Sequence, residues 1–179
     1  MIKRLLTTAR ITKSLPSAES VRQTLSPKVQ SLVQHYPSLL NLEVRWGEED
    51  SFGHLNNVVY CRYVESGRLA YFEQVLSKHL TPKTRIEFMT GKGIGPIVKN
   101  VSITYRAPTW YPDTVTVACR IPKESLSKDR FIQEFIVVSH AQERIVADGT
   151  TLVVIYDYKK HCKTDIPQEI LDAFNLQSN

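Results

Sequence analysis

The chain has 179 residues, of which 42% are hydrophobic and 23% charged, and its formal net charge is +5 at pH 7. This length suits a single domain with a sizeable core, and no apolar run is long enough to span a membrane. Four of the five net positive charges lie within residues 1–22. The remainder is therefore nearly neutral and lacks the basic surface that nucleic-acid binding requires.

Residues 1–22 have the composition of a mitochondrial targeting segment, since they are basic, rich in serine and threonine, and almost free of acidic side chains. In a helix their apolar residues would gather on one side, and Pro16 would end that helix. We therefore expect a cleavable leader and a location in the mitochondrial matrix, with a disordered basic tail as the alternative. Residues 23–40 would then be a linker in which Pro27 and Pro37 limit helix formation.

The folded domain is predicted to span residues 41–174, with a short tail over 175–179. Residues 42–46 alternate apolar and polar side chains, which indicates a strand, and a polar loop with three acidic residues follows. From 57 to 76 apolar residues recur at helical spacing over most of the helix circumference, which predicts a buried helix. Gly67 in its middle costs about 1 kcal/mol of helix propensity relative to alanine. We expect a sheet or a substrate to approach the helix closely at that point.

Five strands are predicted after this helix, at residues 84–89, 96–106, 115–121, 130–139 and 145–156, and then a last helix at 168–174. One strand, one long helix and consecutive strands with short connections indicate an α+β fold with an antiparallel sheet. The long helix can bury its whole circumference only if the sheet curls around it.

The three cysteines, Cys61, Cys119 and Cys162, form no CxxC pair, and no histidine cluster has the spacing of metal ligands. Cys61 falls in the helical pattern and Cys119 in a strand pattern, so we expect both to be small core residues in a reducing compartment. No metal site is expected.

The stretch from Val44 to Tyr60 joins a loop rich in carboxylates to the start of the buried helix. Free N–H groups at a helix start carry partial positive charge and can bind a carbonyl oxygen as it becomes negative. A carboxylate beside them can attack that carbonyl or take a proton from an attacking water. Gly53 allows the backbone to come close to a ligand. Hydrolysis of a thioester needs little more, because the thiolate is a good leaving group.

The same stretch resembles the 4-hydroxybenzoyl-CoA thioesterase-like branch of the hot-dog superfamily, in which a strand that ends in an aromatic residue precedes D-x-D-x-x-G-[HIV]-[VL]-x-x-x-x-Y. The resemblance implies that Asp50, the second acid, is catalytic and that the backbone N–H of Asn57 contacts the oxyanion. It also places three further matching residues in the site: Gly53, His54 and the substrate-binding Tyr60.

The resemblance continues over residues 95–108, 147–154 and 166–170, which look like the second strand, the final strand and the exit to a C-terminal helix. Glu48 departs from the pattern, because it keeps the charge of the first aspartate but adds a methylene group. The family implies a hot-dog fold and hydrolysis of an acyl-CoA, with no cofactor other than the coenzyme A of the substrate. It also implies a homodimer or homotetramer whose active sites are completed by both subunits.

Several of these residues have structural alternatives. Asp50 can simply cap the following helix. Glu65 is a rival catalytic acid, because another hot-dog branch places its catalytic carboxylate on the central helix. Its structural alternative is an ion pair with a neighbouring arginine on that helix. His54 can be an acid, a base or a packing residue. Lys99 and Arg106 either bind the phosphates of coenzyme A or are solvated charges on a strand.

Two other functions compete with acyl-CoA hydrolysis. A hot-dog dehydratase acting on acyl carrier protein needs a histidine near a run of prolines, and the sequence contains no such motif. A non-catalytic hot-dog subunit of a mitochondrial assembly stays open as an alternative because Glu48 departs from the pattern. The otherwise intact stretch from Asp50 to Tyr60 favours an enzyme.

Overall fold

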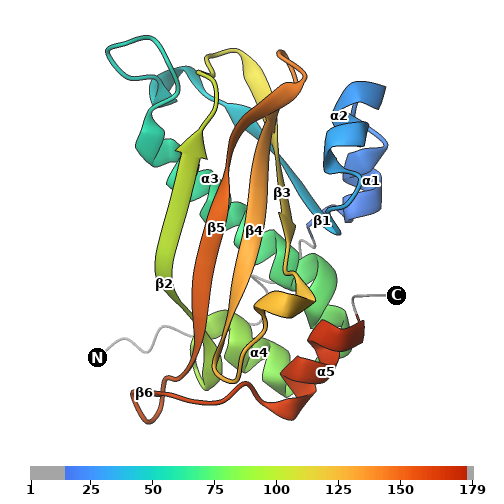
Figure 1. Cartoon of the computed structure of the whole chain (residues 1–179), viewed down its shortest axis with the longest axis vertical. Coiled ribbons are helices and arrows are strands. Elements are labelled where there is room, and N and C mark those ends of the chain that lie inside the picture. The colour runs from blue at the N-terminus through green and yellow to red at the C-terminus, as the bar shows by residue number, and fades with distance from the viewer. Residues whose placement is uncertain (1–14, 177–179) are drawn as a thin grey trace, which may run out of the picture.

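The computed structural model describes residues 15–176, in which a curved antiparallel sheet packs against a long helix (Figure 1). Within this range the strands are β1 (Ser38–Val44), β2 (Ile94–Tyr105), β3 (Asp113–Arg120), β4 (Arg130–Ser139), β5 (Arg144–Asp157) and β6 (Cys162–Lys163). The order across the sheet is β1-β3-β4-β5-β2, and the short β6 pairs with β5. The α-helices of this range are α1 (Ala18–Arg22), α2 (Pro27–Val33), α3 (Asn57–Tyr71), α4 (Pro82–Thr90) and α5 (Gln168–Leu176).

The central helix α3 is continued by a π-helical segment, Phe72–Leu76, and a 3-10 turn, Ser77–His79, so the predicted helix over residues 57–76 is confirmed. Its buried side chains pack in one cluster with inward-facing residues of the sheet, among them Val117, Phe131 and Val153. The strands predicted at 96–106, 115–121, 130–139 and 145–156 correspond to β2, β3, β4 and β5 within two residues at each end. The predicted α+β fold, with a sheet curved around a long helix, is confirmed.

Gly67 lies where α3 is closest to the sheet. A Cβ atom at this position would lie 2.4 Å from Cγ1 of Val117 and 3.2 Å from Sγ of Cys119, both on β3. The expected close approach is therefore made by the sheet. Cys119 is buried as predicted, whereas Cys61 is exposed and the prediction of a core position for it is wrong, because the face of α3 that carries Cys61 is left uncovered.

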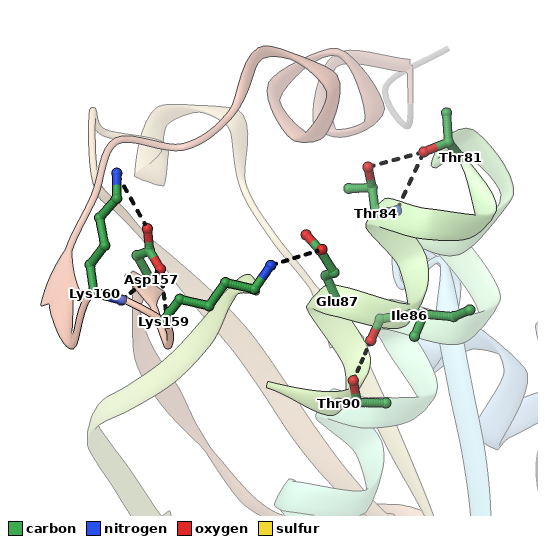
Figure 2. A network of polar contacts seen from close by, with 8 residues as sticks. All are labelled: Thr81, Thr84, Ile86, Glu87, Thr90, Asp157, Lys159 and Lys160. Carbon is green, nitrogen blue, oxygen red and sulfur yellow. Dashed lines mark hydrogen bonds and ion pairs between the residues drawn. The ribbon is translucent and has the colours of Figure 1, made fainter. Parts of the chain in front are cut away.

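The strand predicted at residues 84–89 is wrong, since this segment lies within the helix α4. Thr81 caps the helix by accepting a hydrogen bond from the Thr84 N–H, Pro82 occupies the first turn, and Gly91 ends the helix in the left-handed region at φ 64°. Figure 2 shows this cap and the ion pair of Glu87 with Lys159 that ties α4 to the segment after β5. A segment of six residues was too short for its pattern to separate a strand from a helix.

The predicted linker at residues 23–40 also differs from the structure, which places α2 there and begins β1 at Ser38. Ser26 caps α2 and Pro27 lies at its first position, where the missing N–H costs nothing, so this proline starts a helix rather than preventing one. Apolar residues of α1 and α2 pack against the outer face of β1, β3 and β4, in a cluster of Val21, Leu25, Val29, Val33, Leu39, Ala118, Ile136 and Val138. Residues 1–14, which hold most of the predicted leader, lie outside the described range.

Candidate active site

The loop between β1 and α3 is held by Glu48, whose carboxylate accepts hydrogen bonds from the Tyr63 hydroxyl at 2.6 Å and from the Arg45 N–H at 2.9 Å. Its backbone carbonyl accepts a third bond, from the Asn56 N–H. Burial, and secondarily the neighbouring Glu48, raises the pKa of Tyr63 well above its usual range, so the phenol stays protonated as the donor. The departure from aspartate at this position thus supplies a longer arm that anchors the loop to the helix.

Asp50 lies at the base of a tight turn. Its N–H donates to the His54 carbonyl at 2.9 Å, and its Oδ1 accepts the Phe52 N–H at 2.8 Å. Gly53 donates to the Asp50 carbonyl and has a φ of 72°, a conformation that favours glycine. Within residues 15–176, Oδ2 of Asp50 has no hydrogen-bond partner. The turn therefore fixes the carboxylate through one oxygen and leaves the other free.

The start of α3 presents an unused donor. Asn56 caps the helix, because its side-chain oxygen accepts the Val58 N–H at 3.1 Å and its carbonyl accepts the Val59 N–H at 2.9 Å. The Asn57 N–H, by contrast, has no partner among the residues that the structure describes. An unpaired N–H at a helix start, reinforced by the helix dipole, is suited to bind an oxygen that gains negative charge.

Two tyrosines complete the wall opposite this loop. The Tyr60 hydroxyl donates to Oγ1 of the buried Thr109 at 3.0 Å, and the Tyr105 hydroxyl donates to the Asn57 carbonyl at 3.1 Å. The two tyrosine rings meet edge to face with centroids 5.3 Å apart. Burial raises the pKa of both phenols, so both remain donors. The Leu55 N–H donates to the Thr109 carbonyl, which ties the turn after β2 to the entrance of α3.

These elements enclose a cleft of about 430 Å³, lined by Asp50, His54, Leu55, Asn57, Tyr60, Tyr105, Arg106, Ala107 and Pro108. The structure thus brings together five of the residues predicted from the sequence, and Gly53 shapes the turn beside them. Sequence reasoning missed Tyr105 and Thr109. Tyr105 had a recognisable signal, since it is the last residue of a strand and precedes a turn with proline, but the contact of Thr109 with α3 had none.

Of the two basic residues predicted to bind the phosphates of coenzyme A, only one lies at the cleft. Arg106 reaches the cleft, but its guanidinium is paired with Asp148, which raises the pKa of Arg106 and neutralises much of its charge locally. Lys99 is the extra residue of a bulge in β2, between Val98 and Asn100, and does not line the cleft. Tyr105 lies six positions after Lys99, which corresponds to roughly 20 Å of extended strand, so Lys99 cannot reach the cleft of its own subunit.

The rival carboxylate Glu65 lies away from the cleft. It is 63% exposed, and its Oε1 is 3.9 Å from Nη2 of Arg68, the ion-pair geometry expected at a spacing of three residues on a helix. Within the described residues no group of three or more His, Cys, Asp or Glu side chains could hold a metal ion. No helix between residues 15 and 176 is long and apolar enough to cross a bilayer.

Comparison with known proteins agrees with this geometry. The sequence profile of the thioesterase-like superfamily matches residues 44–174. The long-chain acyl-CoA thioesterase FadM of Escherichia coli (strain K12) is 25% identical over 118 residues, which cover 66% of this chain and 82% of FadM.

Among solved structures, the PA2801 protein of Pseudomonas aeruginosa aligns with a TM-score of 0.62 and 26% identity over 76% of this chain and 96% of its own. A thioesterase of Thermus thermophilus in complex with coenzyme A and Zn aligns with a TM-score of 0.64 and 22% identity over 79% and 94% of the two chains, a likeness of fold. The region matched by the superfamily profile contains every residue that lines the cleft, and the resemblance predicted from the sequence is confirmed.

Proposed function

The chain belongs to the thioesterase-like superfamily, and on this basis we propose that it is an acyl-CoA thioesterase that hydrolyses an acyl-CoA to a free acid and coenzyme A. The observation that carries the proposal is the arrangement of Asp50 and Asn57. A carboxylate with one free oxygen and a helix-start N–H without a partner line the same cleft. These are the two groups that attack on a thioester carbonyl requires.

In the proposed reaction the thioester carbonyl oxygen accepts a hydrogen bond from the Asn57 N–H, which strengthens as that oxygen becomes negative. Asp50 either attacks the carbonyl carbon itself or takes a proton from the water that attacks it. The carbon–sulfur bond then breaks and the thiolate of coenzyme A leaves. If Asp50 acted as the base, it passes the proton from the attacking water to the thiolate. If Asp50 acted as the nucleophile, the thiolate takes its proton from solvent, and water then hydrolyses the mixed anhydride on Asp50 to the free acid and restores the carboxylate. Tyr105 fixes the start of α3 through the Asn57 carbonyl, so the donor on the same residue stays in place.

The test is release of free thiol from a panel of acyl-CoAs by the wild-type protein, Asp50→Asn and Glu65→Gln. Asparagine keeps the size of Asp50 and can still accept the Phe52 N–H, so the fold should be retained. We expect kcat of Asp50→Asn to fall by at least about 10²-fold with KM little changed, the pattern of an interaction made only in the transition state. Glu65→Gln should retain activity, because Glu65 lies outside the cleft.

An active Asp50→Asn protein beside an inactive Glu65→Gln protein would reverse the assignment of the catalytic acid. A wild-type protein that releases no thiol from any acyl-CoA, yet co-purifies with a large complex, would support the non-catalytic alternative. The panel also measures the preferred acyl group directly.

We further propose that the protein is at least a homodimer. β2 is an edge strand that leaves its backbone groups unpaired on one side, and Ile97, Val98 and Val101 are each 37–39% exposed. Such an edge favours pairing with another strand. Antiparallel pairing of two β2 strands would put the start of one beside the Tyr105 end of the other, so each cleft would be completed by its neighbour. Sedimentation that finds a catalytically active monomer would contradict this.

The location is proposed to be mitochondrial, on the composition of residues 1–22. A reporter fused to the full chain should enter mitochondria, whereas a fusion that starts at Leu15 should remain in the cytosol. Import of the shorter fusion would contradict the proposal.

A further inference from the structure

A second cleft lies toward the opposite end of β2 from the candidate active site. It has a volume of about 340 Å³ and lies between α3, α4 and the first half of β2, with Arg68, Phe72, Phe88, Met89, Val98 and Tyr158 among its lining residues. The ion pair of Glu87 with Lys159 links α4, one wall of this cleft, to the segment after β5 (Figure 2). Most of the lining is apolar, and Arg68 is its only charged member within the described residues.

Arg68 lacks the partners that a buried cation needs. Its side chain is only 12% exposed, yet its guanidinium makes no hydrogen bond within residues 15–176, and its ion-pair partner Glu65 stands 3.9 Å away and is 63% exposed. Burial lowers the pKa of Arg68, which reflects the cost of holding the charge there. The polar groups of Thr90 and Tyr158 in the same cleft already donate to backbone carbonyls. A buried charge without short hydrogen bonds is costly, so the guanidinium is suited to bind an anionic acceptor that enters this cleft.

The Arg68 cleft and the active-site cleft share the same two walls, α3 and β2. On this stretch of β2 the residues that face α3 are Val98, Val101 and Ile103, which pair with Val153, Thr151 and Gly149 of β5. Val153 and Thr151 are buried on the inner face of the sheet, and Ile103 packs against the same core. Both valines are nonetheless 37–39% exposed. An apolar surface on β2 therefore lies between the two clefts.

The separation of the two clefts sets the length of a ligand that would reach both. Arg68 lies eleven positions after Asn57 on α3, which corresponds to about 17 Å of helix, the length of an extended chain of roughly a dozen carbon atoms. A thioester carbonyl at the Asn57 N–H would thus place the far end of a medium-to-long acyl chain at the guanidinium.

We propose that Arg68 binds a carboxylate at the far end of the acyl chain, so that the preferred substrates are coenzyme A monothioesters of dicarboxylic acids with about a dozen carbon atoms. This inference rests on the proposed thioesterase function. A phosphate of coenzyme A could supply the same anionic oxygens, but it lies on the other side of the thioester from the acyl chain. The apolar surface between the clefts suits methylene groups and not a nucleotide.

The test compares kcat/KM for dodecanedioyl-CoA with that for its ω-methyl ester, which has the same length and no terminal charge. The wild-type protein should prefer the free carboxylate by at least about tenfold, the effect of a charge-assisted hydrogen bond in a poorly solvated cleft. Arg68→Met should bring this ratio close to one, and Arg68→Lys should leave an intermediate ratio. Arg62→Met is the matched control, because Arg62 is an exposed arginine on the same helix that does not line the cleft, and its ratio should equal that of the wild type.

The ratio is measured within each variant, so it does not depend on how much of the protein is folded. A wild-type ratio near one, or an unchanged ratio in the Arg68 variants, would overturn the proposal. A loss of the dimer in Arg68→Met would assign the guanidinium to a subunit contact instead. An Arg68 effect that disappears with 3′-dephospho-coenzyme A thioesters would assign it to the phosphate. If no acyl-CoA is hydrolysed at all, the thioesterase proposal fails, and calorimetric titration with dodecanedioate and its monomethyl ester still tests the cleft.

Discussion

Replacing Gly67 by alanine should destabilise the fold even though alanine is the better helix former. The helix itself would gain about 1 kcal/mol from the substitution. The new Cβ, however, would lie 2.4 Å from Cγ1 of Val117, well inside the separation of about 3.5–4.0 Å at which two carbon atoms pack favourably. Val117 is on β3, in the middle of the sheet, and is 1% exposed, so neither wall can move away cheaply.

Overpacking of this kind costs about 1–3 kcal/mol, and an overlap of more than about 1 Å belongs at the upper end of that range. The net effect is then a loss of about 1–2 kcal/mol, which corresponds to a fall in Tm of roughly 2–8 °C for a domain of this size. Urea unfolding followed by circular dichroism measures the change, at one fixed protein concentration because an oligomer gains stability by mass action. Ser66→Ala is the control, since it changes the neighbouring helix residue away from β3 and should stay within about 0.5 kcal/mol of the wild type.

A double-mutant cycle with Val117→Ala identifies the cause. Removing the two Val117 methyl groups leaves room for the new Cβ, so the double variant should be more stable than the sum of the single changes predicts, by at least about 1 kcal/mol. If Gly67→Ala is as stable as the wild type, or if the two costs simply add, the close approach of α3 to β3 does not explain this glycine.

Three further outcomes are expected. A chain that starts at Leu15 should melt like the full chain. A chain that starts at Pro37 should lose several kcal/mol of stability and scatter light on heating, because without the apolar side chains of α1 and α2 the outer face of the sheet is uncovered. Equal melting temperatures of these two shortened chains would contradict this. Tyr63→Phe should cost about 1.5–3 kcal/mol, since the Glu48 carboxylate loses its hydroxyl donor, and thermal unfolding will show no change if the Glu48 anchor is unimportant. Burial lowers the pKa of His140 in the folded protein, so folding favours the neutral imidazole. The stability that the neutral side chain contributes is present above its pKa of about 6.5 in the unfolded chain, and it is lost as the pH falls through the lower pKa of the folded state. His140→Gln should therefore flatten the fall in stability as the pH drops below about 6.5, and parallel profiles would refute the assignment.

The amino-acid sequence by itself determined the parts of this protein that local rules govern. Strands β2 to β5 and the helix α3 follow from apolar periodicity, which acts over one or two turns or pleats. The active-site loop is also local, because the Asp50 turn, the positive φ of Gly53 and the cap of α3 all form within a few residues of one another. The family resemblance supplied the chemical role of this loop, which the spacing alone leaves open.

Only the tertiary structure decided which surfaces are covered. Local caps start helices α4 and α2, but packing against the rest of the protein decided which of their side chains are buried, namely Phe88 of α4 and Val29 and Val33 of α2. The contact of Thr109 with Tyr60 joins positions 49 residues apart, and no local pattern encodes it. The uncovered side of α3 likewise depends on where the sheet ends. For that reason Cys61 is exposed, and Arg68 faces an apolar cleft rather than the solvent that its charge predicts.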